Sequence, residues 1–224
     1  MSTEQIWLDG LTHELDFWDR WLATEGLEWP DEYRRRFDPN LRLSNYHQGF
    51  VEDLDKATID ILDVGAGPVT HVGKTHPGKS LNLIPVDALA DEYNQLLSKY
   101  ERCPPVPTLP CRSENLQTQF ADSSFDLTLA QNCLDHTVDP LRSVAQMLAV
   151  TRPRGWVLLN HSENEADHEN FEGLHQWNIT LEDNDLIIRG QHHSVNVSQE
   201  LASLGKFSCV RTAERYIRVH IRKY

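Results

Sequence analysis

The stretch DILDVGAGPVTHVG, residues 60–73, decides the fold. An apolar run leads into a tight glycine turn, which is how nucleotide-binding α/β domains begin. Gly65 and Gly67 supply the turn, but Val69 stands where a third glycine is usual. The stretch predicts a first parallel strand followed by a ligand-binding loop, and it leaves open which nucleotide-like ligand the loop holds.

Downstream of this stretch, short apolar runs alternate with helical stretches as far as residue 161. This alternation is typical of βαβ units, which form a parallel sheet through right-handed crossovers. The predicted strands lie at 81–87, 108–111, 124–131 and 155–161, and the predicted helices at 88–100 and 140–151. Further on we predict a hairpin of 177–181 and 185–189, a helix near 197–205, and a closing antiparallel pair at 207–214 and 215–223.

Upstream of the first strand, an apolar stripe predicts an amphipathic helix over residues 3–23. The stripe has steps of four, four, three and four residues and consists of Trp7, Leu11, Leu15, Trp18 and Leu22. Shorter helices are predicted at 31–37 and 44–54. Such a cap either packs on the edge of the sheet or covers a substrate site, and both interpretations stay open.

Composition and charge restrict the partners of this chain. Its 224 residues fit one α/β domain, and its formal net charge is −13. A negative field repels phosphate backbones and anionic lipid, so we expect neither nucleic acid nor a membrane as partner. The four cysteines show no disulfide or metal-site spacing, and neither an export signal nor a membrane span is visible. We therefore expect a cytoplasmic protein with a small-molecule acceptor, and the oligomeric state stays unknown.

Two acidic residues accompany the glycine turn. Asp63 lies two residues before Gly65, where pyrophosphate-binding loops usually keep an apolar residue. A carboxylate there favours a ligand with an amino or sulfonium group and argues against NAD. Asp87 ends the second predicted strand, where an acid accepts hydrogen bonds from ribose hydroxyls. Asp87 therefore indicates a nucleoside, and Asp63 indicates a cationic one.

Five motifs, in this order, resemble the class I S-adenosylmethionine-dependent methyltransferases over about residues 55–160. They are LDVGAG at 62–67, the acid at 87, CRSENL at 111–116, SFDLTLAQNCLDH at 124–136 and RPRG at 152–155. The resemblance implies an α/β, Rossmann-like fold whose mostly parallel seven-stranded sheet has an antiparallel C-terminal strand and helices on both faces. It also implies S-adenosyl-L-methionine as cofactor, bound by Asp63, Gly65, Ala66, Gly67, Asp87, Ala88, Ser113, Glu114 and Asn132.

The chain departs from that family's pattern in two places. Arg112 replaces an acid before the adenine-contacting pair, so adenine recognition falls to Ser113, Glu114 and backbone groups. Val69 replaces the third glycine and implies a tighter loop beside the methionine moiety. The resemblance further implies one methyltransferase domain over 1–224. Its parts are a helical cap (1–55), a cofactor-binding core (56–161), an insert lining the acceptor site (162–196), and a C-terminal helix with a strand hairpin (197–224).

Catalytic candidates are histidines near the open ends of the strands. Methyl transfer needs a base only when the acceptor must lose a proton, and His136, His161 and His175 are placed to act as one. Asp135 either orients His136 or caps the following helix. An acidic, histidine-containing cluster could hold a divalent metal, but it lacks regular ligand spacing, and we predict no metal. That cluster consists of His161, Glu163, Glu165, His168 and Glu169.

The leading hypothesis is a methyltransferase that acts on a small polar metabolite, such as a sugar or secondary metabolite, with oxygen favoured over nitrogen as the acceptor atom. The alternative is a methyltransferase-like protein that binds the cofactor without catalysis and regulates a partner. A dinucleotide-dependent oxidoreductase is disfavoured by Asp63 and by the absent third glycine. The sequence contains no motif that identifies the methyl acceptor.

Overall fold

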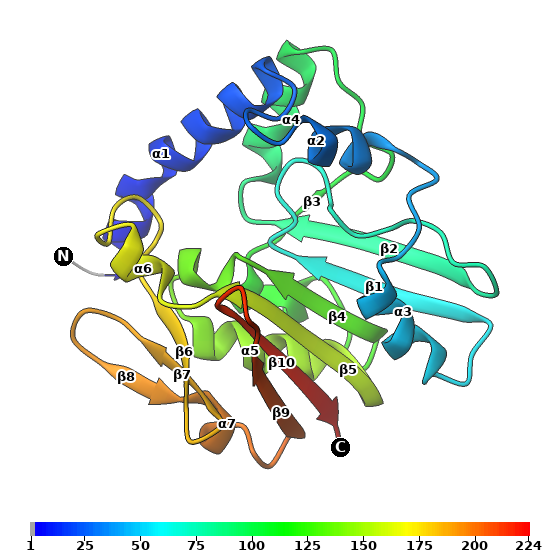
Figure 1. The fold of residues 1–224 in the computed structure, drawn as a ribbon, viewed down its shortest axis with the longest axis vertical. Coiled ribbons are helices and arrows are strands. Elements are labelled where there is room, and N and C mark those ends of the chain that lie inside the picture. Colours follow the sequence, from blue (N-terminus) through cyan, green and yellow to red (C-terminus); the bar gives the residue numbers. More distant parts are fainter. Residues whose placement is uncertain (1–2) are drawn as a thin grey trace.

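A seven-stranded sheet forms the centre of the computed structural model, which describes residues 3–224 (Figure 1). The strand order is β3-β2-β1-β4-β5-β10-β9. The first five strands pair in parallel, whereas β10 runs antiparallel to both of its neighbours, which confirms the predicted fold class. The strands are β1 (Thr58–Val64), β2 (Ser80–Asp87), β3 (Leu109–Pro110), β4 (Phe125–Gln131), β5 (Thr151–Ser162), β9 (Gly205–Arg211) and β10 (Tyr216–Lys223).

Both faces of the central strands are buried, because helices and loops cover each side. On one face Leu62 and Leu159 share a core with α5 (Pro140–Val150), and on the other Leu127 and Leu158 share a core with α3 (Asn45–Glu52). Successive side chains of a strand alternate between the two faces. Residues that are neighbours in sequence at a strand end therefore reach different environments.

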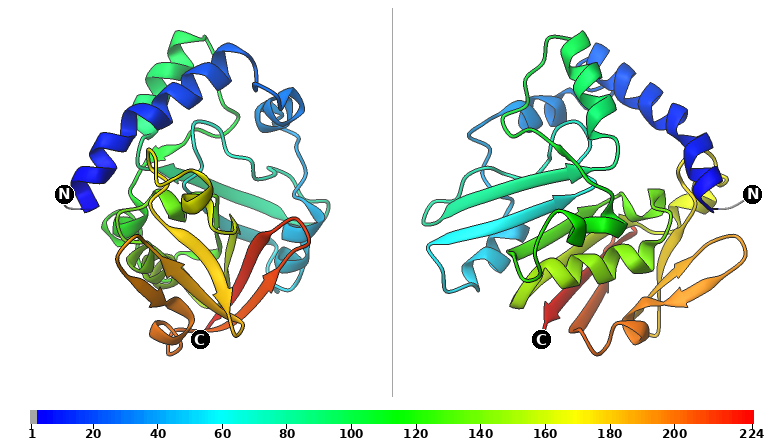
Figure 2. Two further views of the ribbon diagram at one scale, coloured as in Figure 1. Left: turned by 60° about the vertical axis from the view of Figure 1, so that its left-hand side comes forward. Right: turned by 180° about the vertical axis from the view of Figure 1, so that it is seen from behind.

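The N-terminal cap consists of α1 (Thr3–Ala23), α2 (Pro30–Phe37) and α3, as predicted. One end of α1 lies against α4 (Ala90–Lys99), where Lys99 Nζ donates to Asp19 Oδ1 at 2.7 Å. The other end meets the loop after α6 (Glu165–His168) so closely that a Cβ at Gly10 would lie 2.6 Å from the Gly173 carbonyl oxygen. α1 thus bridges two distant parts of the chain (Figures 1 and 2).

The segment after β5 forms a second, three-stranded sheet of β6 (Asn178–Glu182), β7 (Asp185–Arg189) and β8 (Ser194–Asn196). The predicted hairpin is confirmed as β6 and β7, and β8 was not predicted. The predicted helix near 197–205 is only the single turn α7 (Val197–Glu200). None of the helices between residues 3 and 224 has the length and apolar character needed to cross a bilayer.

The connection from β1 to β2, residues 65–79, contains no helix. It packs instead against the chain that precedes α3, where Leu43 N donates to Thr75 O at 3.0 Å and Lys74 N to Leu41 O at 2.6 Å. Gly73 permits this contact, because any Cβ there would clash with the backbone of Arg42. The packing holds residues 35–43 beside the glycine loop.

Candidate functional site

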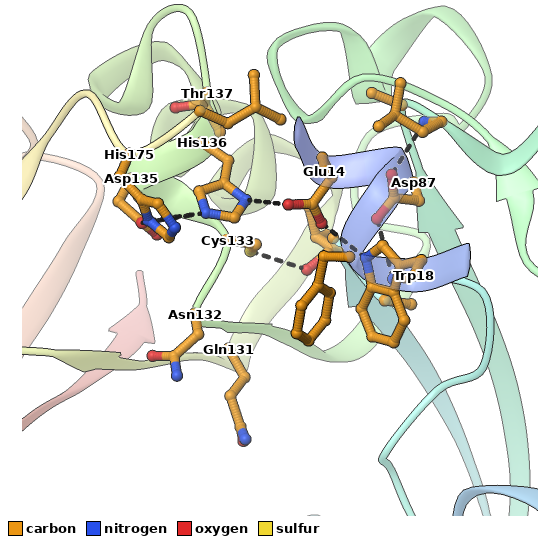
Figure 3. Close-up of a pocket in the computed structure, with 18 of the residues that line it drawn as sticks. Glu14, Trp18, Asp87, Gln131, Asn132, Cys133, Asp135, His136, Thr137 and His175 are labelled. Carbon is orange, nitrogen blue, oxygen red and sulfur yellow. Dashed lines mark hydrogen bonds and ion pairs between the residues drawn. The ribbon is translucent and has the colours of Figure 1, made fainter. Parts of the chain in front are cut away.

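A cavity of about 700 Å³ lies at the carboxyl ends of β1, β2 and β4, beneath α1 (Figure 3). Open α/β sheets bind their ligands at this edge. Of the twelve predicted site residues, Asp63 and His161 do not line the cavity. The ten that do are Gly65, Ala66, Gly67, Asp87, Ala88, Ser113, Glu114, Asn132, His136 and His175.

The glycine loop forms one wall of this main cavity and requires its glycines. Gly65 and Gly67 have φ of +69° and +66°, in the left-handed region that favours glycine. A Cβ on Gly67 would lie 2.8 Å from the Trp18 ring of α1. Asp87 ties the loop to β2, because its carboxylate accepts from Gly67 N and Leu89 N, both at 2.9 Å. Burial raises the pKa of Asp87 to about 6, against the effect of these two hydrogen bonds.

Asp63 lies behind the glycine loop. It is 1% exposed and accepts a 2.5 Å hydrogen bond from Thr70 Oγ1. Burial raises the pKa of its carboxyl to about 7. Val69, in the place of a third glycine, is fully buried in a cluster with Trp21 and Leu22. A valine at this position therefore packs the loop against the N-terminal cap.

The opposite wall begins in the 3-10 turn η1 (Ser113–Thr118). Glu114 is 8% exposed and accepts from the backbone of Val138 at 2.8 Å, so it holds the loop after β4 in place. Arg112, which also lines the cavity, forms a 2.8 Å ion pair with Glu4 and lies over the Trp7 ring. Asn132 has φ of +44°, and its side chain accepts from Ser162 N at 2.9 Å.

Asp135, His136 and His175 form a cluster at the side of the cavity (Figure 3). His175 Nδ1 lies 2.7 Å from Asp135 Oδ2 and 3.1 Å from His136 Nε2. Burial disfavours the charged ring of His175, but the hydrogen bond and charge of Asp135 outweigh it and raise the His175 pKa. Asp135 thus orients a histidine, although the one it binds most closely is His175. It does not cap α5, because Asp139 does so by accepting from Arg142 N at 2.9 Å.

His161 does not reach the main cavity. It is 2% exposed, neither ring nitrogen has a hydrogen-bond partner among the described residues, and burial lowers its pKa to about 4. It pairs in register with Ile217, so its side chain faces the apolar core on the α5 side, opposite to that of Asn160. The expectation that His161 faces the acceptor is therefore not met, because strand alternation points it to the other face.

The same three-residue cluster is the one group in residues 3–224 with a donor set for a metal ion, since its ligand atoms lie within 4.8 Å of one another. Two imidazoles and a carboxylate are a set that divalent metals accept. In the structure these atoms are already joined by hydrogen bonds. The acidic cluster considered from the sequence is not gathered, because Glu163 is held by Arg211 and Thr180 and His168 is exposed.

Sequence reasoning did not assign a role to Glu14 of α1. Its carboxylate accepts from Trp18 Nε1 at 2.7 Å and lies 3.7 Å from His136 Nδ1, so the cap reaches the histidine cluster across the cavity. The apolar stripe predicts the helix and includes Trp18, but Glu14 is not part of the stripe, and no sequence motif marks it as a site residue. Trp177 belongs to the core, where its Nε1 donates to Thr137 O at 2.7 Å.

Comparisons with known proteins agree with this geometry. Residues 62–159 match the family model described as a methyltransferase domain. An uncharacterised methyltransferase of Mycolicibacterium vanbaalenii is 30% identical over 108 residues, which are 48% of this chain and 40% of that protein. The chain thus spans less than half the length of this curated relative.

Solved structures share the fold. The CMeT domain of the citrinin polyketide synthase aligns with a TM-score of 0.56 and 18% identity over 79% of this chain and 50% of that one. The trans-methyltransferase CalH, solved in complex with SAH, aligns with a TM-score of 0.52 and 14% identity over 75% of this chain and 52% of that one. The motif order, the fold and the match over residues 62–159 make this chain similar to the class I S-adenosylmethionine-dependent methyltransferases, and this likeness indicates S-adenosylmethionine as its cofactor.

Proposed function

We propose that this chain transfers a methyl group from S-adenosylmethionine to a hydroxyl oxygen of a small polar metabolite, such as a sugar or a secondary metabolite. The observation that carries the proposal is the presence of an Asp135–His175 pair, whose aspartate is buried, in the same cavity as the glycine loop and Asp87. One part of the cavity suits a nucleoside cofactor, and another suits proton removal from an acceptor.

The residues of the glycine loop fit the cofactor. Gly65 and Gly67 let the loop pack closely, since a Cβ at Gly65 would clash with Cys133 and one at Gly67 with Trp18, and the loop backbone thereby forms part of the cavity wall. Asp87 uses each carboxylate oxygen for one backbone N–H, which leaves lone pairs for the vicinal hydroxyls of a ribose. Burial raises the pKa of Asp87 in the cavity wall and of Asp63 behind the glycine loop, and a cationic ligand in the cavity would favour the ionised form of both carboxyls. When bound, S-adenosylmethionine supplies a methyl group activated by its sulfonium charge.

The histidine cluster supports an acceptor that loses a proton. Asp135 accepts a hydrogen bond from His175 Nδ1, which fixes the tautomer and leaves Nε2 of the same ring as the basic nitrogen. The raised pKa of His175 keeps this ring a stronger base than free histidine. A hydroxyl acceptor needs such a base as the new bond forms.

We further propose that the cap and the insert form the acceptor end of the cavity. Glu14 lines it from α1, and Glu165, Leu174 and His175 line it from the insert. These parts lie outside the cofactor-binding core, which gives the acceptor a binding surface separate from that of the cofactor. The cavity volume of about 700 Å³ suits a cofactor together with a small acceptor.

The test is incubation of the purified protein with S-adenosylmethionine carrying an isotope-labelled methyl group and a pool of low-molecular-weight metabolites. We expect label in an acid-stable product of low mass, with a methyl ether identified by mass spectrometry. Binding of SAH without label transfer to any pool would favour the alternative, a cofactor-binding regulatory protein. Failure to bind either form of the cofactor in calorimetry would overturn the proposal.

A further inference from the structure

A second cavity, of about 230 Å³, adjoins the main one and shares His71 and Gln131 with it. It lies on the α3 side of the sheet, where the chain before β1 packs against the loop after β1. Water occupies about 30 Å³ per molecule in the liquid, so this space has room for a compact polyatomic group. Its lining residues are Arg35, Leu41, Arg42, Ser44, Tyr46, His47, His71, Gly73, Gln131, Asn160 and Arg218.

Three strands place a polar row along the floor of this second cavity. Asn160 of β5 pairs in register with Gln131 of β4 on one side and with Arg218 of β10 on the other. Residues paired across neighbouring strands lie on the same face of a sheet. The positions before them on this face, Leu129 and Leu158, belong to the apolar core. The sheet thus changes from apolar to polar at the cavity.

The cationic side chains of this cavity have no anionic partner. Arg35, Arg42 and Arg218 form no ion pair or hydrogen bond through their guanidinium groups with any residue between 3 and 224. The guanidinium of Arg218 lies over the Tyr46 ring, 4.9 Å from its centroid. Its Nε is buried without a hydrogen-bond partner among the described residues, as is the Tyr46 hydroxyl. Glu214 feels the charge of Arg218 but forms no ion pair with it.

Unpaired buried donors are costly, and folded proteins usually satisfy them. They are more unexpected here, because the chain as a whole carries a formal net charge of −13. The two histidines of this cavity are held in the neutral form, mainly by burial. Burial and the charge of Arg218 lower the pKa of His47 to about 4, and burial with the charges of Arg36, His47 and Lys74 lowers that of His71.

We propose that the second cavity binds a compact oxyanion, a carboxylate, phosphate or sulfate group of the methyl acceptor, through Arg218, Arg42 and Arg35. Guanidinium groups bind such oxyanions with charge-assisted and often bidentate hydrogen bonds. Because the two cavities meet at His71 and Gln131, an acceptor anchored there extends into the main cavity. The proposal rests on the proposed function and narrows its acceptor to an anionic metabolite.

The experiment titrates sodium sulfate, phosphate and acetate into the SAH-saturated protein at constant ionic strength, and follows the arginine Nε–H signals by NMR. We expect saturable binding of at least one anion, with a shift of the Arg218 signal. Tighter binding of sulfate or phosphate identifies a tetrahedral group, and tighter binding of acetate identifies a carboxylate. Absence of saturation with all three anions would overturn the proposal.

Variants distinguish anion binding at this site from a nonspecific effect of the protein's total charge. R218Q should weaken anion binding about 10-fold or more, and so should R42Q, whose exposed side chain is not needed for folding. R189Q is the control, because it removes an equal charge from an exposed residue of β7 that pairs with Glu182. Equal weakening in R189Q and R218Q would contradict a specific site.

The same titrations keep the two proposals apart. SAH affinity should be unchanged in R218Q and R42Q, because neither residue lines the main cavity. Loss of anion binding with intact SAH binding would contradict only the oxyanion site. Failure of the wild-type protein to bind SAH would contradict the proposed methyltransferase function itself.

Discussion

The two cavities adjoin, yet their charged groups differ. The main cavity is lined by carboxyl groups, among them Asp87 and Asp135, together with arginines such as Arg36. The second cavity has the free guanidinium groups of Arg42 and Arg218, and no Asp or Glu between residues 3 and 224 lines it. The same sheet builds both, because residues at the ends of β2 and β4 serve the first and residues of β4, β5 and β10 serve the second. One sheet can thus hold the proposed site for a cationic cofactor next to the proposed site for an anionic group, with His71 and Gln131 lining both cavities.

The largest expected effect comes from the base of the main cavity. H175Q should lower the rate of methyl transfer about 10²- to 10⁴-fold, the usual contribution of a general base. SAH affinity and sulfate binding should stay unchanged, because neither depends on His175 Nε2. The measurement is single-turnover transfer of labelled methyl, with H168Q as control, since His168 is an exposed histidine of the same insert. An equal loss in H168Q would contradict the assignment.

Asp87 should have the next largest effect. D87N keeps the size of the side chain but removes the charge that favours ribose hydroxyls and a cationic cofactor, and its NH2 group replaces one of the two oxygens that accept from Gly67 N and Leu89 N. SAH binding measured by calorimetry should weaken about 10- to 100-fold, the range of a hydrogen bond to a charged group. D91N, in the exposed first turn of α4, changes the same charge and should bind SAH normally. Sulfate binding in the second cavity should survive in both variants.

The roof of the main cavity can be loosened without touching either set of charges. G10A places a methyl group 2.6 Å from the Gly173 carbonyl oxygen and 2.7 Å from Leu174, so α1 must shift away from the insert. The free energy of unfolding should fall by about 1–3 kcal/mol in urea titrations. G49A is the matched control, because nothing lies within 4 Å of a Cβ there and the substitution in α3 should stabilise slightly. Equal stability of G10A and the wild type would contradict the close packing of α1.

The smallest effect is the pH dependence, which should differ between the cavities. In the free protein the pKa of Asp87 is about 6 and that of Asp63 about 7. A cationic ligand favours the ionised carboxylates, so the affinity for S-adenosylmethionine should rise as the pH increases through these values and level off above them. The slope cannot exceed about 10-fold per pH unit for each group.

Calorimetry in two buffers of different ionisation enthalpy should show proton release on binding near pH 6.5. Sulfate binding should stay flat between pH 6 and 8, because arginine does not titrate there and His47 has a pKa near 4. Proton uptake on binding of S-adenosylmethionine would contradict the role given to the two carboxyls.

Much of the fold was predictable, because it follows from local pattern. The apolar runs before Gly65 and Asp87 end in residues that parallel strands place at one edge, and ten of the twelve predicted residues line one cavity there. The exceptions have physical reasons. His161 and Asn160 are neighbours in sequence, but strand alternation points their side chains to opposite faces of the sheet. Which face each side chain takes is set by the packing of β5 beside β10, which the local sequence does not reveal.

The second cavity was not predictable from the sequence. Arg42 and Arg218 are 176 residues apart, and they meet only because the connection from β1 to β2 lacks a helix and packs against the chain before α3. Nothing in the local sequence around Arg35 or Arg218 indicates that the two residues line one cavity.

The most direct test of this division of roles is calorimetric titration of S-adenosylmethionine into the wild-type protein, D87N and R218Q at pH 7.5. One binding site is expected in the wild type, with at least 10-fold weaker binding in D87N and unchanged binding in R218Q. No binding to the wild type, or equal weakening in both variants, would contradict a cofactor site formed by the main cavity alone.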